Sequence, residues 1–297
     1  MTYQEFKEQI YTGVEKRCTP GANMHHFTFT KNNGVELDGL SIYYEGQSIS
    51  PTLYLNDYYP LVSKGLSIDN IIEKLLEASK RAVNIPNFTP EDIQDFSKVK
   101  SAIFFKLINK RANETLLSDV PYVKYLDLAI VFCIMIPMDT KNWGSILIHD
   151  NLLETWNITK ETLLEYAKIN TYQIFAPKVT PLRDLLKEML SKEDKELFPD
   201  LTPAFPMLVV TNCRNNHGAS VICYPDYLKN LATEMDTDFI ILPSSIHEVI
   251  LLPLEGSMDI GQLSQMVQQV NATQLSPEEV LSDHAYLYLR HENKVVF

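Results

Sequence analysis

One uninterrupted apolar run, Leu128–Met138, constrains the fold more than any other feature of this 297-residue chain. Its letters are LAIVFCIMIPM, with no polar residue among them. The run is far shorter than the roughly 20 residues that a helix needs to cross a bilayer. A strand that is apolar on both faces has to be buried on both faces. The run therefore predicts an internal strand of a covered sheet.

The segments around this run alternate between strand and helix patterns. The N-terminal segment predicts a helix, because apolar residues recur along it at helical spacing. Those residues are Tyr3, Phe6, Ile10 and Val14. Strands are predicted for the hairpin GLSIYYEGQSISPTLYL around Glu45-Gly46, for KSAIFFKLIN and WGSILIHD, and for MLVVTN, ASVICY, DFIIL and HEVILLP. This mixture predicts an α+β fold of repeated β-hairpin-plus-helix units, forming largely antiparallel sheets packed with helices.

An internal repeat is predicted when the segments are aligned. TLYLNDYYPLVSKGLSIDNIIEKLLEAS parallels SILIHDNLLETWNITKETLLEYAKINT, and SVICYPDYLKNLATEM begins a weaker third copy. We expect four regions along the chain. They are an N-terminal α+β region at 1–98 with the first hairpin-helix unit, a central hairpin-helix unit at 99–178, a proline-rich, charged linker or surface excursion at 179–205, and a C-terminal α+β region at 206–297. The linker is expected to hold a short helix around LRDLLKEML.

An aspartate stands near the start of the helix in each copy, at Asp57, Asp150 and Asp226. We expect these residues to cap helices, since a carboxylate accepts the unpaired N–H groups of a first turn. A catalytic role is the alternative. Ser67 and Thr159 are expected to cap helices in the same way, each with an acid two residues later.

Composition argues against several classes of function. Lys+Arg is 26 and Asp+Glu is 38, a formal net charge of −12. Such a chain repels phosphate backbones, so we do not expect nucleic-acid binding. It also lacks an apolar signal segment at the N-terminus, and we expect a cytoplasmic protein without membrane association. An acidic mimic of nucleic acid is an alternative, although the acids are mixed with lysines.

Motifs for cofactors and metals are missing from the sequence. Neither G-x-x-x-x-G-K-[ST] nor G-x-G-x-x-G occurs, and 10 glycines are spread over the chain. The stretch HEVIL at His247 lacks the second histidine of H-E-x-x-H and lies in a strand-like run. We therefore predict no cofactor and no metal.

The polar residues within DFIILPSSIHEVILLP are the strongest catalytic candidates. Ser244 or Ser245 could act as nucleophile and His247 as base, with an acid such as Glu248 nearby. Ser245 and His247 would share one face of a strand. The simpler interpretation is a turn: Pro243 ends one strand and the serines accept turn N–H groups. No catalytic residue is assigned on this basis.

Two other groups of residues are candidate contacts for a ligand or partner. Capping does not explain the stretch VNATQ before the helix start SPEEV, so Asn271 and Thr273 could face a ligand or lie against the sheet. Tyr58 and Tyr59 could form part of a tyrosine-rich protein contact, although core packing is the usual role of such residues.

Four long motifs, in order, carry a family resemblance: ISPTLYLNDYY, LDLAIVF, ILPSSIHEVILLP and VNATQLSPEEVLSD. With them the chain resembles an uncharacterised family of Gram-positive anaerobic bacteria, classified as a domain of unknown function. The segments LDLAIVF, HDNLLETWNITKETLLEYAKINT and DFIILPSS are more loosely similar to the YtpQ-type family of low-GC bacteria. The resemblance implies a cytoplasmic bacterial protein and supplies no catalytic residue.

The sequence therefore predicts a non-enzymatic intracellular binding or regulatory protein, whose partner would be another protein. The main alternative is a hydrolase-type enzyme that uses the residues around His247. The nucleic-acid mimic is the second alternative.

Overall fold

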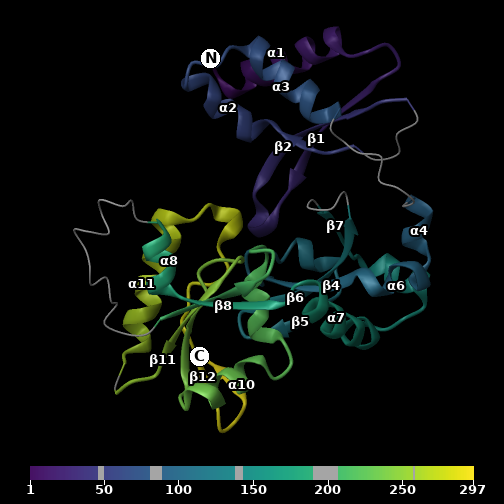
Figure 1. The fold of residues 1–297 in the computed structure, drawn as a ribbon. Helices are drawn as coiled ribbons and strands as arrows, with labels where there is room; N and C mark the ends of the chain where they lie inside the picture. The colour runs from purple at the N-terminus through teal and green to yellow at the C-terminus, as the bar shows by residue number, and fades with distance from the viewer. Residues whose placement is uncertain (46–49, 81–88, 138–142, 190–206, 257) are drawn as a thin grey trace. The chain divides into compact units, whose positions relative to one another are not determined.

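A computed structural model of the chain describes residues 1–45, 50–80, 89–137, 143–189, 207–256 and 258–297 (Figure 1). It has helices and open, largely antiparallel sheets, which confirms the predicted α+β class. The chain divides into two compact units. Unit 1 comprises Met1–Asp95 and Ile136–Gly144, and unit 2 comprises Phe96–Met135 and Ser145–Phe297. The predicted internal repeat and the four predicted regions remain predictions.

Unit 1 packs helices against a small sheet with the strand order β1-β2-β3. Its elements are α1 (Tyr3–Arg17), β1 (Asn23–Thr30), β2 (Glu36–Tyr43), β3 (Leu53–Tyr54), α2 (Leu55–Ser63), α3 (Ile68–Lys80) and α4 (Pro90–Gln94). The core contains Phe6, Ile10 and Val14 of α1, which confirms the predicted apolar face of this helix. Ile71 and Leu75 of α3 belong to the same core.

Strand β1 was missed by sequence reasoning. It pairs with β2 along its whole length, from Asn23 opposite Tyr43 to Thr30 opposite Glu36. Most of β1 is exposed, so its apolar residues give no clear strand signal. The predicted hairpin is correct in that β2 and β3 pair antiparallel. Gly46 of its expected turn lies outside the described residues.

Unit 2 begins with a four-stranded sheet in the order β4-β6-β5, with β7 also paired to β6. Its elements are α5 (Phe96–Val99), β4 (Ile103–Asn109), β5 (Tyr122–Tyr125), β6 (Leu128–Pro137), β7 (Trp143–Leu147), α6 (Asp150–Trp156) and α7 (Lys160–Ile174); the last two residues of β6 and the first two of β7 are counted with unit 1. Residues 128–134 of β6 are all at most 8% exposed. The apolar run is therefore an internal strand, as predicted.

The outer edge of β4 is closed by side chains rather than by another strand. The backbone N–H of Phe105 donates to Oγ1 of Thr171 at 3.0 Å. The backbone N–H of Leu107 donates to Oγ of Ser220 at 3.2 Å. Thr171 and Ser220 are both buried. Because a buried, unpaired N–H costs free energy, these two hydroxyls stabilise the edge of the sheet.

A six-stranded sheet forms the rest of unit 2, in the order β13-β12-β10-β11-β9-β8. Its elements are β8 (Pro177–Pro181), α8 (Leu182–Met189), β9 (Leu208–Asn212), the 3-10 helix η4 (Gly218–Cys223), α10 (Tyr227–Met235), β10 (Phe239–Leu242), β11 (Val249–Pro253), α11 (Ile260–Gln274), β12 (Tyr286–Leu289) and β13 (Lys294–Val296). Val267 of α11 packs against Ile240 of β10 and Leu252 of β11. This contact places α11 on one face of the sheet (Figure 1).

Three segments differ from their predicted structure. The segment ASVICY, predicted as a strand, forms the 3-10 helix η4. Within the predicted linker, residues 179–181 form the end of β8, which pairs with β9, whereas the predicted short helix around LRDLLKEML is confirmed as α8. Prolines at both ends of β8 are compatible with its place at the edge of the sheet. The start SPEEV has a complete capping box at Ser276 but forms a single 3-10 turn, Pro277–Glu279.

The three aspartates do not cap their helices as predicted, although two of them lie in a first turn, where the helix dipole favours a carboxylate. Tyr54 and His149 occupy the N-cap positions of α2 and α6, so Asp57 and Asp150 lie inside the first turns. Asp226 is the N-cap residue of α10, but its side chain accepts no capping hydrogen bond. The two hydroxyl caps are confirmed. Ser67 accepts the N–H of Asn70 at 3.2 Å, and Thr159 accepts the N–H of Thr162 at 3.3 Å.

Candidate functional site

The predicted polar island, Pro243–Glu248, connects β10 to β11, and these strands pair antiparallel as expected. It is not a free turn, because its backbone pairs with the segment that follows α11. The N–H of Ile246 donates to the carbonyl of Glu279 at 2.9 Å. The N–H of Leu281 donates to the carbonyl of Ser244 at 2.8 Å. The island is therefore held inside unit 2 by residues distant in sequence.

Ser245 and His247 lie close together, but not as a nucleophile and its base. Oγ of Ser245 accepts the backbone N–H of His247 at 2.9 Å, and Ser245 is 3% exposed. Nδ1 of the His247 ring accepts the backbone N–H of His217 at 3.3 Å. A ring nitrogen that accepts an N–H carries no proton, so the ring proton lies on Nε2, 3.7 Å from Oε1 of Glu279. The described residues contain no hydrogen bond between this ring and a serine hydroxyl.

Gly218 allows the chain to pass close to the island. A Cβ atom at this position would lie 2.1 Å from Oγ1 of Thr211 and 2.4 Å from the carbonyl oxygen of His247. Oγ1 of Thr211 donates to the same carbonyl at 2.7 Å. Sequence reasoning did not single out this glycine, although a glycine after the polar stretch NCRNNH is a signal of close backbone approach. The polar groups around His247 therefore bond neighbouring segments of the chain to one another.

The stretch VNATQ forms the last turn of α11, and most of its polar groups bond within the fold, although the buried Oδ1 of Asn271 has no hydrogen-bond partner among the described residues. Nδ2 of Asn271 donates to the carbonyl of Ser282 at 2.9 Å and to the carboxylate of Asp283 at 2.8 Å. Oγ1 of Thr273 donates to the carbonyl of Gln269, one turn earlier, at 2.8 Å. Asn271 joins the helix end to the segment before β12, and we do not place it in a ligand site.

The remaining predicted candidates lie apart from one another. Tyr58 and Tyr59 belong to α2 and pack against the core of unit 1, and the Tyr59 hydroxyl donates to the carbonyl of Met1 at 3.0 Å. Ser244 and Glu248 are half-buried in unit 2. In the described chain, neither has a side-chain hydrogen bond or ion pair. The sequence candidates therefore do not assemble into one site.

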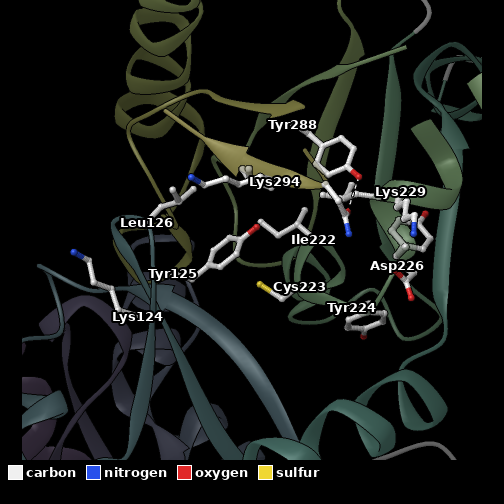
Figure 2. A pocket seen from close by; sticks show the side chains of 14 residues that line it. Lys124, Tyr125, Leu126, Ile222, Cys223, Tyr224, Asp226, Lys229, Tyr288 and Lys294 are labelled. Carbon is white, nitrogen blue, oxygen red and sulfur yellow. Dashed lines mark hydrogen bonds between the residues drawn. The ribbon is translucent and has the colours of Figure 1, made fainter. Parts of the chain in front are cut away.

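Unit 2 contains a cavity of about 420 Å³ that sequence reasoning did not find. We call it the lysine pocket (Figure 2). Three stretches and one strand residue line it: 124–126 at the β5–β6 turn, 222–224 with 226–229 at the start of α10, 293–295 at the β12–β13 turn, and Tyr288. Its volume lies within the range of roughly 300–1,000 Å³ that is typical of small-ligand pockets.

Three lysines give this pocket its charge. Lys124, Lys229 and Lys294 line it, and Asp226 is the one carboxylate among its lining residues. Within the described chain, none of the three lysines forms an ion pair. Lys124 and Lys294 lie on one side of Tyr125, and Lys229 and Asp226 lie on the other (Figure 2). In a chain with a net charge of −12, the pocket is a local region of positive charge.

The other ionisable groups of the pocket are neutral near pH 7. Burial raises the pKa of the Cys223 thiol and the pKa of the Tyr125 hydroxyl far above their ordinary values. Burial also raises the pKa of Tyr227 to about 12. A cysteine nucleophile needs a lowered pKa, because the thiolate is the reactive form. The pocket is therefore suited to binding rather than to nucleophilic attack.

Strained backbone marks all three turns of the pocket. Leu126, Asp226 and Asn293 each have a left-handed conformation, with φ of 56°, 55° and 47°. Among the described residues with positive φ other than glycine, Leu126 is the only one that is not asparagine, aspartate or histidine. A left-handed residue of this kind costs roughly 1–2 kcal/mol. Retained strain often accompanies a ligand site.

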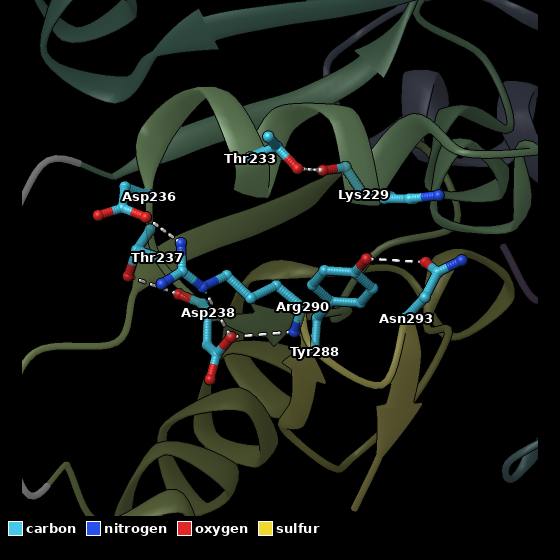
Figure 3. A network of polar contacts seen from close by, with 8 residues as sticks. All are labelled: Lys229, Thr233, Asp236, Thr237, Asp238, Tyr288, Arg290 and Asn293. Atoms are coloured by element: carbon cyan, nitrogen blue, oxygen red, sulfur yellow. Dashed lines mark hydrogen bonds and ion pairs between the residues drawn. The ribbon is translucent and has the colours of Figure 1, made fainter.

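A polar network holds the β12–β13 turn against α10 and β10 (Figure 3). The Arg290 guanidinium pairs with Asp236, and its Nε lies 4.0 Å from the Asp238 carboxylate. The backbone N–H of Arg290 donates to the same carboxylate at 2.9 Å. The Tyr288 hydroxyl donates to Oδ1 of Asn293 at 2.8 Å, which leaves Nδ2 of this amide as a donor for a ligand. The turn is thus fixed in a position where it lines the pocket.

The described residues contain no group of three side chains placed to hold a metal ion. They also include no helix with the length and apolarity that crossing a membrane requires.

A family model described as a family of unknown function, DUF5688, matches residues 3–290. No curated protein and no solved structure matches the chain. The matched range contains most of the residues that line the lysine pocket; those at 293–295 follow it.

Proposed function

The chain belongs to the family of unknown function DUF5688, and we propose that it is a non-enzymatic binding protein for a small organic anion. We further propose a bacterial, cytoplasmic protein, in keeping with the resemblance to Gram-positive anaerobic and YtpQ-type families. A partner protein would then respond to the bound ligand.

One observation carries this proposal: three lysines without acidic partners line one cavity in an acidic chain. An unpaired ammonium group in a concave site attracts anions, and the low-dielectric walls strengthen that attraction. Apolar side chains such as Leu126, Ile222 and Val295 line the same cavity. The combination of apolar walls with a few placed charges is typical of a small-molecule site.

The hydrolase alternative receives less support from the geometry. The hydroxyl of Ser245 is occupied by a backbone N–H, and the ring of His247 lies against Glu279. A nucleic-acid mimic would need a row of aligned acids, whereas the proposed site is lined by three lysines and one carboxylate. We therefore retain binding as the proposed function.

Calorimetric titration with phenyl phosphate tests the proposal, with phenol as the neutral control. We expect binding of phenyl phosphate and much weaker binding of phenol. The double variant Lys124→Gln/Lys294→Gln should bind phenyl phosphate roughly ten-fold more weakly, since each lost ion pair is worth up to about 1 kcal/mol. The variant Lys187→Gln changes an exposed lysine of α8 outside the pocket and should bind normally.

Two results would contradict the proposal. One is no detectable binding of phenyl phosphate by the wild-type chain. The other is equal binding by the double variant and by Lys187→Gln.

A further inference from the structure

We propose that the ligand of the lysine pocket is a free aromatic amino acid that carries a phosphate on its ring. This inference rests on the proposed function and adds the chemistry of each end of the ligand. It follows from the unequal distribution of charge along the pocket. Tyr125 separates two lysines on one side from a lysine and a carboxylate on the other (Figure 2).

The first end of the pocket suits a dianion. Lys124 belongs to β5 and Lys294 to β13, and neither has an acidic partner among the described residues. Their side chains are exposed and long enough to adjust to a ligand. A phosphate ester carries a charge of about −1.5 to −2 at pH 7, which matches two ammonium groups. A single carboxylate would leave one of the two charges unbalanced.

The opposite end suits a zwitterion. Lys229 and Asp226 together carry no net charge, and they lie on the same side of the pocket (Figure 2). The two side chains are not paired with each other. An α-carboxylate would pair with Lys229, and an α-ammonium group would pair with Asp226. Nδ2 of Asn293, oriented by the bond from Tyr288, adds a donor for the carboxylate.

The middle of the pocket suits an aromatic ring. Tyr125, Ile222 and Cys223 lie between the two charged ends (Figure 2). The thiol and the phenol are neutral there because burial raises the pKa of each. Their surfaces offer ring contacts and a sulfur–aromatic contact. A cavity of about 420 Å³ has room for an aromatic amino acid with its ring substituent.

This arrangement differs from a simple phosphate cradle. A cradle would gather all three lysines around one anion, whereas Lys229 lies away from Lys124 and Lys294 (Figure 2). The zwitterionic end also distinguishes the free phosphorylated amino acid from the same residue within a protein. A phosphotyrosine within a protein has no free α-ammonium or α-carboxylate group, so Asp226 and Lys229 would find no counter-charges.

Three probes test each end of the ligand by calorimetric titration. They are O-phospho-L-tyrosine, its N-acetylated and C-amidated form, and L-tyrosine. We expect O-phospho-L-tyrosine to bind at least five-fold more tightly than either of the other two, because each lacks the ion pairs of one end.

Two variants should affect the probes in opposite ways. Lys294→Gln should weaken binding of O-phospho-L-tyrosine and of its blocked form about two- to five-fold, and leave L-tyrosine unchanged. Asp226→Asn should weaken O-phospho-L-tyrosine and L-tyrosine by a similar factor and leave the blocked form unchanged. Asparagine also adopts the left-handed conformation found at this position, so the variant should fold.

The outcomes separate this inference from the proposed function. Equal binding of the blocked and free forms would show that the pocket does not recognise the α-ammonium and α-carboxylate groups. Unchanged binding of O-phospho-L-tyrosine by Asp226→Asn would show the same. In both cases the proposed binding of an anion would still stand. Tight binding of L-tyrosine and none of either phosphorylated probe would overturn the phosphate end and the proposed function together. The absence of binding by all three probes, with phenyl phosphate bound, would overturn this inference alone.

Discussion

The island around His247 and the lysine pocket are both polar regions of unit 2, and they are built in opposite ways. In the island, hydroxyl, imidazole and backbone groups bond to one another at 2.7–3.3 Å. In the pocket, lysines without acidic partners surround a cavity of about 420 Å³. Most buried polar groups are hydrogen-bonded, and a group that is bonded within the fold is not available to a ligand. The charged residues left for a ligand are those that line a cavity.

The largest expected effect belongs to the island. Gly218→Ala should destabilise the chain by about 3 kcal/mol, because overpacking forces backbone to move. The added Cβ would lie 2.4 Å from the carbonyl oxygen of His247. Chemical denaturation measures the change. Gly261→Ala in α11 is the matched control, and it should stay within about 1 kcal/mol of wild type. Equal effects of the two changes would mean that the island is not tightly packed.

A smaller loss is expected for the hydroxyl of Ser245. Ser245→Ala leaves the part-buried N–H of His247 without its acceptor, which should cost about 1–2 kcal/mol. Ser244→Ala, at a half-buried neighbour, should change stability by less than about 0.5 kcal/mol. Denaturation curves of both variants provide the comparison. If Ser245→Ala kept full stability and instead abolished a hydrolytic activity, the island would be a catalytic site and not a structural one.

Local patterns made much of this fold predictable. The apolar run of β6, the face of α1 and the caps Ser67 and Thr159 depend on neighbouring residues, and the sequence predicts all of them. The hydrogen bonds between the island and residues 279–282 join positions far apart along the chain, so no local sequence pattern predicts them. The lysine pocket is the extreme case, since its lysines come from three elements far apart in the sequence: Lys124 from β5, Lys229 from α10 and Lys294 from β13. The left-handed Leu126 has no sequence signal at all, because leucine disfavours that conformation.

In the lysine pocket, one substitution, at Leu126, is expected to raise the stability of the chain. Leu126→Asn should stabilise the chain by about 1 kcal/mol, since asparagine tolerates a positive φ better than leucine. The same variant should bind the ligand more weakly, because an apolar wall becomes polar. The reverse change, Asn157→Leu at the left-handed end of α6, should cost about 1 kcal/mol without affecting binding. A loss of stability in Leu126→Asn would mean that packing of the leucine outweighs its strain.

The smallest effect is expected at Tyr227. Its hydroxyl is buried and has no hydrogen-bond partner among the described residues, so Tyr227→Phe should keep or slightly raise stability at pH 7. Burial raises the pKa of this hydroxyl from 10.0 to about 12 in the folded chain. Between these two values the unfolded chain loses the proton and the folded chain keeps it, so stability falls as pH rises. The contribution is fully present below pH 10 and is lost as the pH passes 12.

Urea denaturation at pH 8, 9.5 and 10.5 isolates this contribution, because the phenylalanine variant cannot titrate there. Its stability should fall less steeply than that of wild type, and the remaining slope would come from other buried tyrosines such as Tyr125 and Tyr286, whose pKa values burial also raises. Identical slopes would show that the Tyr227 hydroxyl reaches water in the folded chain. Water would then reach the wall of the pocket at α10. The pocket would differ from the tightly packed island in its access to solvent as well as in its charge.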